Sequence, residues 1–218
     1  MTLGLLYYTA NKLPTSFAEK VREQLKLVMP KGAPLVSVSM APIEFGDNIV
    51  VSPRPPSAEN VYRQILVGAK VMTTDLIACC EDDCLYTSAH FELSPPKGEF
   101  WYDLNSWRLD PDRFWWRNRT NMSGCICHRE DLINTLQDRV DHYNPAKVKS
   151  WAEPGKYEAF LGITKVVRRN LKASLPMIHI NHEFGINNRR KVKPDDISVT
   201  ELAPWGPAPA LWEKFCGH

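Results

Sequence analysis

Short apolar runs alternate with amphipathic stretches through the first 80 residues of the chain. The runs have the length and the β-branched or aromatic character of strands: Leu3–Tyr8, Leu35–Met40, Asn48–Val51 and Asp75–Cys80. Residues 17–28 and 58–71 place apolar side chains on one face at helical spacing, and Ser57 can cap the second of these helices. Strands that alternate with helices predict an α/β domain with a mostly parallel central sheet flanked by helices.

The pattern weakens after residue 95. It predicts short strands at residues 100–102 and 125–127, a helix near 130–143 and a further strand at 176–180. The Pro-rich run at 204–209 is typical of a loop or tail. The sequence therefore predicts a single domain over residues 1–203, followed by a C-terminal tail over 204–218.

Composition supports an ordinary globular domain. Of the 218 residues, 44% are hydrophobic and 10% aromatic. No apolar run approaches the ~20 residues needed to span a bilayer, and the N-terminus lacks a basic leader. We therefore expect a cytoplasmic protein without a membrane anchor.

The six cysteines fit a reducing compartment. Cys79 and Cys80 are neighbours in an apolar run, which is not the spacing of a secreted disulfide framework. The run Cys125-Ile-Cys127-His128 offers zinc ligands, but no CxxC or HxxxH motif elsewhere completes a tetrahedral set. Buried, reduced thiols are the favoured interpretation.

Charge is mild overall but uneven. The formal net charge is +2, too small to indicate a nucleic-acid binder. Residues 161–193, however, hold eight Lys or Arg against the single acidic residue Glu183. This stretch forms either a basic face that attracts diphosphates or polyanions, or in part a solvated helix face.

An acidic cluster, Glu81-Asp82-Asp83, directly follows the buried strand at 75–80. In open α/β sheets, ligands bind outside the carboxyl ends of the strands. Because residues i and i+2 of an extended segment project the same way, Glu81 and Asp83 can converge on one cation. Their oxygens suit Mg²⁺ or Mn²⁺, and a solvated acidic turn is the alternative.

Two histidines follow the strand at 176–180. His182 precedes a glycine-containing turn and an arginine pair, which makes it a candidate metal or phosphate ligand. We expect His179, inside the strand, to be structural.

The order of these features resembles the GT-A superfamily of nucleotide-diphospho-sugar glycosyltransferases, and more narrowly small phage-encoded, DNA-modification-associated members. The resemblance covers about residues 3–192 and rests on these motifs: Tyr7-Tyr-Thr9, Val36-Ser-Val-Ser39, Tyr62-Arg-Gln-Ile65, the DxD-like Glu81-Asp82-Asp83, Asn105-Ser-Trp-Arg108, Ser123-Gly124-Cys125 and His182. The first position of the DxD-like motif departs from the family, since it is Glu rather than Asp.

The resemblance implies a metal-dependent transfer of sugar from a nucleotide-sugar, with a UDP-sugar favoured, to a hydroxyl acceptor. It assigns Mn²⁺ or Mg²⁺ to Glu81, Asp83 and His182. It assigns the base, ribose and diphosphate to Tyr8, Thr9, Asn11, Asn60 and Arg63, and a wall of the sugar or acceptor pocket to Ser123 and Gly124. A surface salt bridge is the alternative for Arg63.

An inverting enzyme also needs a carboxylate that deprotonates the acceptor. Glu153 and Glu158 are the candidates, whereas a retaining enzyme would not need this base.

The segment Trp107–Arg119 interleaves tryptophans with arginines. Such a surface can stack bases and bind phosphates, so a hydroxymethylpyrimidine in phage DNA is one expected acceptor. The same tryptophans could equally be core residues. Other interpretations are a glycan or small-molecule acceptor, a metal-dependent nuclease or phosphatase, and a non-catalytic nucleotide-binding protein.

Overall fold

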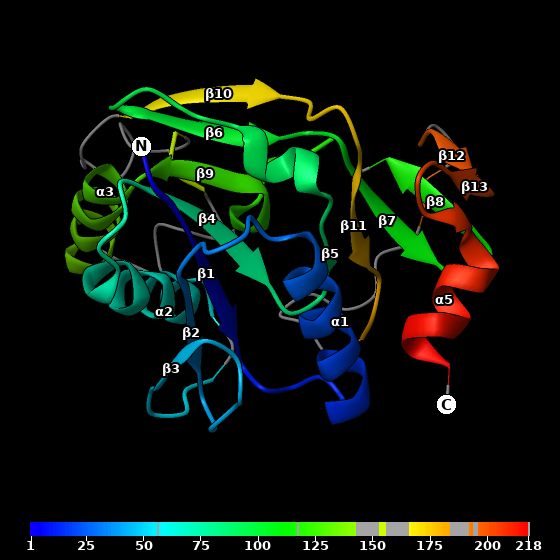
Figure 1. Cartoon of the computed structure of the whole chain (residues 1–218), viewed down its shortest axis with the longest axis horizontal. Coiled ribbons are helices and arrows are strands. Elements are labelled where there is room, and N and C mark those ends of the chain that lie inside the picture. Colours follow the sequence, from blue (N-terminus) through cyan, green and yellow to red (C-terminus); the bar gives the residue numbers. More distant parts are fainter. Residues whose placement is uncertain are drawn as a thin grey trace.

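The computed structural model of the chain is organised around two β-sheets (Figure 1). It describes residues 1–55, 57–116, 118–142, 153–155, 166–183, 192–193 and 196–217. None of the helices within these ranges has the length and apolar character needed to cross a bilayer.

The larger sheet has seven strands in the order β10-β6-β9-β4-β1-β2-β3. Strand β9 is antiparallel to both of its neighbours, and the other adjacent pairs are parallel. The α/β class and the mostly parallel sheet are therefore confirmed. The strands are β1 (Leu3–Thr9), β2 (Leu35–Ser39), β3 (Asp47–Val50), β4 (Leu76–Glu81), β6 (Glu99–Asp103), β9 (Cys125–His128) and β10 (Val167–Leu171).

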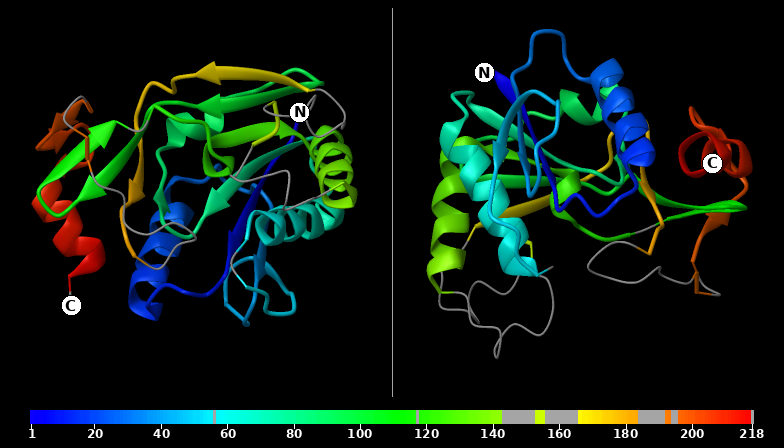
Figure 2. Two further views of the ribbon diagram at one scale, coloured as in Figure 1. Left: turned by 180° about the vertical axis from the view of Figure 1, so that it is seen from behind. Right: turned by 90° about the horizontal axis from the view of Figure 1, so that it is seen from below.

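Helices cover both faces of this sheet (Figure 2). On one face, α2 (Ala58–Val71) and α3 (Arg129–Asp141) pack on a core that includes Leu6, Ile77 and Phe100. On the other face, α1 (Thr15–Val28) and the short 3₁₀ helix η1 (Ser88–Glu92) cover a core that includes Tyr7. Successive residues of each central strand thus face opposite helical layers, which is why these strands are apolar throughout.

Helix α2 begins where the sequence predicts. Its cap residue Ser57 has an extended backbone, and its hydroxyl oxygen accepts a 3.2 Å hydrogen bond from the backbone N–H of Asn60. Gly68 lets the helix approach β1, because a Cβ there would lie 2.1 Å from Leu6 Cδ1.

A second sheet of five strands, in the order β12-β8-β7-β11-β5, was not predicted. Its strands are β5 (Cys84–Leu85), β7 (Ser106–Asp110), β8 (Arg113–Trp116), β11 (Met177–Ile180) and β12 (Ser198–Val199). The Trp- and Arg-rich segment forms the antiparallel β7–β8 hairpin of this sheet.

The C-terminal segment differs from the expected tail. It forms a small hairpin of β13 (Glu201–Leu202) and β14 (Gly206–Pro207), followed by helix α5 (Ala208–Cys216). Ala208, Leu211 and Phe215 lie on one face of this helix and are buried in a third core against α1 and the second sheet. Pro207 occupies the N-cap position, so the Pro-rich run precedes a helix instead of extending as a loop.

Candidate functional site

The predicted acidic motif lies at the carboxyl end of β4, next to the end of β1. Tyr8 is the neighbour of Glu81 in the parallel β1–β4 pairing, and its hydroxyl donates a 2.8 Å hydrogen bond to Glu81 Oε1. The ring of Tyr8 is buried in the core beneath α2. Tyr8 therefore contacts the site through its hydroxyl, and its proposed stacking on a base stays a prediction.

A strand of the second sheet completes a group of side chains that could hold a metal ion. Strand β11 pairs antiparallel with β5 and sets His179 directly opposite Cys84. Cys84 Sγ lies 3.1 Å from His179 Nδ1 and 3.2 Å from Asp83 Oδ1. Glu81, Asp83, Cys84 and His179 each offer one ligand atom, and these atoms lie within 4.8 Å of one another. A single cation could contact all of them.

Sequence reasoning missed two members of this group. His179 was expected to be structural, and Cys84 was given no role. Cys84 follows the acidic motif directly, which is a weak local signal. Its contact with His179 depends on the β5–β11 pairing across 95 positions, which no local pattern indicates.

His182 lies beside this group. Its Nε2 is 3.3 Å from Asp83 Oδ2, and its side chain is half-buried. Burial disfavours the charged imidazolium, but the hydrogen bond to Asp83 and the charges of Asp83 and Asp82 outweigh it and raise the His182 pKa. His182 thus lies beside the acidic motif but is not one of the four side chains of the candidate metal group, and its role as a metal or phosphate ligand stays a prediction.

The two neighbouring carboxyls of the motif differ in acidity. Burial opposes ionisation of Asp83, yet the hydrogen bond from His182 and the His182 charge hold its pKa well below its usual range. Burial and the Asp83 charge raise the pKa of Asp82 to about 6. Asp83 is thus the stronger acid of the two, while Asp82 is bonded to the Thr9 hydroxyl.

Thr9 and Asn11 brace the turn after β1. Thr9 Oγ1 accepts a 2.9 Å hydrogen bond from the backbone N–H of Asn11. Asn11 adopts the left-handed conformation (φ 52°), and its Oδ1 accepts from the backbone of Met40 and Ala41 at 2.7 and 2.9 Å. These contacts fix the loop beside the acidic motif.

Asn60 and Arg63 lie in the first turns of α2. The Asn60 amide donates to the carbonyl of Pro55, and the side chain is buried. Arg63 Nη2 lies 2.7 Å from Glu59 Oε1, which is the surface ion pair that the sequence allowed as its alternative role. Donor binding by either residue stays a prediction.

Ser123 and Gly124 are both buried, and both belong to the 3₁₀ helix η2 (Met122–Gly124). Ser123 Oγ lies 3.3 Å from His179 Nε2 and donates to Asn121 Oδ1. These residues therefore lie behind the candidate metal group. Forming a wall of an acceptor pocket stays a prediction for them.

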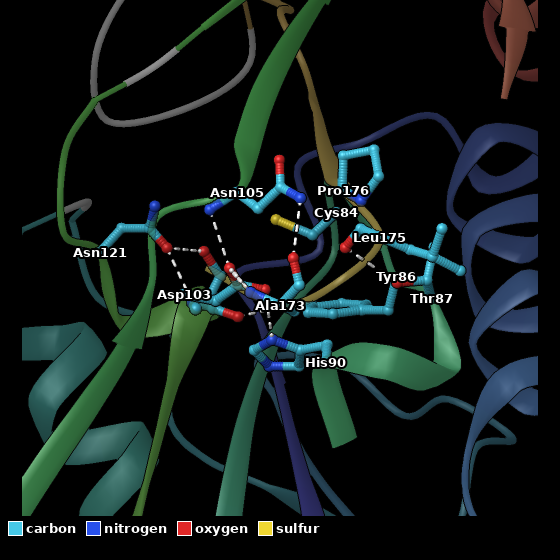
Figure 3. A network of polar contacts seen from close by, with 12 residues as sticks. Cys84, Tyr86, Thr87, His90, Asp103, Asn105, Asn121, Ala173, Leu175 and Pro176 are labelled. Carbon is cyan, nitrogen blue, oxygen red and sulfur yellow. Dashed lines mark hydrogen bonds and ion pairs between the residues drawn. The ribbon is translucent and has the colours of Figure 1, made fainter. Parts of the chain in front are cut away.

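The polar network continues away from the metal group (Figure 3). Asp103 forms a fully buried pair with His90, with Nδ1 and Oδ2 3.2 Å apart. Asp103 Oδ1 also accepts from the backbone of Asn105 at 2.8 Å and of Ala173 at 3.1 Å. Asp103 thus ties the carboxyl end of β6 to the loops that follow β6 and β10.

Of the two candidate catalytic bases, Glu153 lies within the described residues and Glu158 lies outside them. Glu153 is buried, and its carbonyl accepts a 3.1 Å hydrogen bond from Arg139 of α3. Glu153 also lies near Tyr102 of the core that α3 covers. The pKa of Tyr102 is raised chiefly by burial, and the charges of Cys125 and Glu153 add to this effect. Glu153 therefore lies on the side of the sheet that α3 covers.

The described part of the Trp- and Arg-rich segment is mainly structural. Trp115 is buried and donates a 3.1 Å hydrogen bond to Asp110 Oδ2, while Trp116 donates to the carbonyl of Leu104. Arg108 donates to Asn181 Oδ1 at 3.0 Å, and its charge lowers the pKa of His182. The hairpin therefore brings one positively charged side chain, that of Arg108, toward the site.

Half of the predicted basic stretch cannot be placed, since its members at 165 and 189–191 lie outside the described residues. Arg168 and Arg169 project from the exposed strand β10.

Comparisons with known proteins identify the fold. No family model and no curated protein matches the sequence. The structure is similar to a solved glycosyltransferase involved in glycosylation of the major capsid of PBCV-1, with a TM-score of 0.51, 12% identity, 82% of this chain covered and 93% of the other. At this identity the similarity shows a shared α/β fold.

Two further solved structures match at lower scores. A nucleotidyl transferase from Methanothermobacter thermautotroptrophicus has a TM-score of 0.48 and 12% identity, over 80% of this chain and 88% of the other. The bifunctional IspDF of Campylobacter jejuni has a TM-score of 0.42 and 9% identity, over 80% of this chain and 50% of the other.

Proposed function

We propose that this chain is a metal-dependent glycosyltransferase that moves a sugar from a nucleotide-sugar to a hydroxyl acceptor. One observation carries the proposal. Glu81 and Asp83 converge with His179 at the carboxyl end of β4, which is where open α/β sheets bind their ligands. The shared fold with the capsid glycosyltransferase is consistent with it.

The donor atoms fit a divalent cation. Two carboxylates and an imidazole lie within 4.8 Å of one another, and the contact with His182 keeps Asp83 ionised. Glu81 and Asp83 would hold the ion. When bound, it would supply Lewis-acid stabilisation of the charge on a departing nucleoside diphosphate.

Two cationic side chains can assist from the protein. His182 has a raised pKa and contacts Asp83, so it can present a proton to a phosphate oxygen beside the metal group. Arg108 adds a fixed positive charge from the β7–β8 hairpin. Groups that meet developing negative charge in a partly buried site stabilise it strongly.

We place the base and ribose of the donor, a UDP-sugar in the first instance, along the β1 end and the start of α2. Thr9 and Asn11 shape the loop that follows β1, and Asn60 and Arg63 lie in the first turns of α2. Either Glu153 or Glu158 would be the base of an inverting enzyme.

The acceptor is proposed only as a hydroxyl compound. A DNA base was one candidate, but the buried indole of Trp115 and the internal hydrogen bond of Trp116 leave less aromatic surface for stacking than the sequence predicted.

The decisive experiment is a thermal-shift screen of UDP- and GDP-sugars, with and without a divalent cation. We expect metal-dependent stabilisation by one donor, lost in Asp83→Asn and kept in Asp112→Asn, an exposed aspartate of the β7–β8 turn. Donor stabilisation that survives both EDTA and Asp83→Asn would contradict the proposal.

Mass spectrometry of candidate acceptors, including hydroxymethylated DNA, then identifies the acceptor. Plasmid nicking without any sugar donor would instead favour a nuclease.

A further inference from the structure

Two of the ligand atoms in the candidate metal group are softer than carboxylate oxygens. Cys84 Sγ and His179 Nδ1 lie 3.1 Å apart, and Asp83 Oδ1 lies 3.2 Å from the sulfur and 3.9 Å from the nitrogen. Both Cys84 and His179 are fully buried. The three atoms thus form a compact triangle, with Glu81 close by.

A chain of hydrogen bonds determines which nitrogen of His179 faces this triangle. The backbone N–H of Gly124 donates to Asn121 Oδ1 at 2.8 Å, which identifies that atom as an acceptor. The Ser123 hydroxyl must therefore donate its proton to the same oxygen. Ser123 Oγ then has lone pairs for the N–H of His179 Nε2, which lies 3.3 Å away.

This arrangement leaves the lone pair of His179 at Nδ1, on the side of Cys84 and Asp83. Histidine ligands in metal sites commonly donate their other N–H to a neighbouring group, which fixes the tautomer and the ring orientation. Glu81 has a comparable support, because the buried Tyr8 hydroxyl donates to its Oε1 at 2.8 Å. Two of the ligands are thus held by groups behind them.

We propose that this centre is a zinc-class site, in which Cys84 thiolate and His179 Nδ1 join Asp83 as ligands and select Zn²⁺ or Co²⁺ over Mg²⁺ and Mn²⁺. Thiolate and imidazole favour Zn²⁺ strongly, whereas Mg²⁺ and Mn²⁺ favour sites made of oxygen atoms. Glu81 completes a set of four ligands, the number that Zn²⁺ takes in tetrahedral sites, and a fifth position can form when substrate binds.

The inference deepens the proposed function by naming the class of its metal, and it assigns Cys84 as the residue that determines metal choice. Ser123 is a positioning residue, since it acts through His179.

The test uses Co²⁺ added to the metal-free full-length protein, followed by optical absorption. A thiolate ligand gives a near-ultraviolet sulfur-to-cobalt charge-transfer band. We expect this band in the wild type and in Cys127→Ser, a variant of a fully buried thiol on β9. We expect its loss in Cys84→Ser.

Competition titrations measure the selectivity. Zn²⁺ should displace Mn²⁺ and Mg²⁺ from the wild type, and Cys84→Ser should weaken Zn²⁺ binding by about tenfold or more while changing Mg²⁺ binding little. Ser123→Ala should weaken Zn²⁺ binding by about tenfold and keep the charge-transfer band.

The wild-type spectrum needs no variant, so a folding defect in Cys84→Ser cannot mask the result. Absence of the band in the wild type, or its survival in a folded Cys84→Ser, overturns the inference, as does tighter binding of Mg²⁺ or Mn²⁺ than of Zn²⁺. The donor screen is a separate measurement. A cobalt–thiolate band without donor binding would sink the proposed function alone, and donor binding with Mn²⁺ but no such band would sink the metal inference alone.

Discussion

The hydroxyl of Tyr8 donates a 2.8 Å hydrogen bond to Glu81 Oε1 across two adjacent parallel strands. The phenol is buried under α2, while the carboxylate is half-buried at the end of β4. A core residue thereby fixes the orientation of a candidate ligand.

Tyr8→Phe should therefore affect both stability and metal binding. Removing a hydrogen bond to a carboxylate should lower the free energy of unfolding by about 1.5 kcal/mol. Loss of this support should weaken metal binding about tenfold. Urea unfolding and metal titration measure the two effects.

Tyr102→Phe is the matched control, because the buried Tyr102 hydroxyl donates at 2.9 Å to the carbonyl of Pro154 and not to a candidate ligand. It should lose comparable stability and retain its metal affinity. Equal losses of metal affinity in the two variants would show that the effect of Tyr8 is general destabilisation.

His182→Ala should slow sugar transfer about a hundredfold, as removal of one group that stabilises transition-state charge typically does. The reason is its contact with Asp83 beside the metal group and its raised pKa. Steady-state turnover with the identified donor measures this. His142→Ala, which removes an exposed histidine at the end of α3, should keep wild-type turnover. An unchanged rate in His182→Ala would remove this residue from the mechanism.

Gly68→Ala should destabilise the fold although alanine favours helix. The new methyl group would lie 2.1 Å from Leu6 Cδ1 and 2.9 Å from Val38 Cγ2. Overpacking of this kind costs about 1–3 kcal/mol, and better helix propensity offsets about 1 kcal/mol. Chemical denaturation should show a net loss of about 1 kcal/mol.

The variant Leu6→Val tests the cause of that loss. Shortening Leu6 should relieve the clash, so the double variant should be less destabilised than the sum of the two single variants. If the losses of stability in the two single variants simply add, the cost of Gly68→Ala does not come from its contact with Leu6.

Asp75→Ala should show a pH-dependent stability difference from the wild type. The backbone N–H of Thr2 donates to Asp75 Oδ2 at 2.7 Å, and this bond, with that of the Thr2 hydroxyl, lowers the Asp75 pKa below its ordinary 3.8. A lowered carboxyl pKa stabilises the fold above the unfolded-state value, and the effect is lost as pH falls through the folded-state value. The difference in melting temperature should be present at neutral pH and vanish in strong acid. A difference that persists there would have another origin.

Phe215→Ala should cost about 3 kcal/mol, as expected for a buried phenylalanine. Glu213→Ala, on the exposed face of α5, should change stability by less than about 0.5 kcal/mol. A loss of stability in Phe215→Ala as small as that in Glu213→Ala would mean that the packing of α5 contributes little to the stability of the fold.

An element could be predicted from the sequence where the residues that determine it lie within the element itself. Helix α2 agrees with its predicted limits, because the Ser57 cap and the apolar spacing lie within the helix itself. The second sheet escaped prediction, because several of its strands are two to five residues long and pair across distant positions. Helix α5 was hidden by the prolines that precede it and begin it.

The candidate site divides in the same way. The convergence of Glu81 and Asp83 was predicted from their i, i+2 spacing at a strand end, although Asp83 lies in the turn between β4 and β5 and not in an extended segment. The addition of Cys84 and His179 follows from strand register, which only the assembled second sheet defines. Local spacing therefore predicted half of the metal group.

The β5–β11 register also sets an order of events during synthesis. The ribosome releases the acidic motif and Cys84 long before His179, which follows 95 positions later. Contacts of such large sequence separation form late, because the intervening chain must first be ordered. A nascent chain can thus pair β1, β2 and β4 while its carboxylates and thiol still lack the imidazole. Loading of the proposed metal would accordingly be a late step in the maturation of this protein, and a chain interrupted before β11 would carry the acidic motif without Cys84's partner His179.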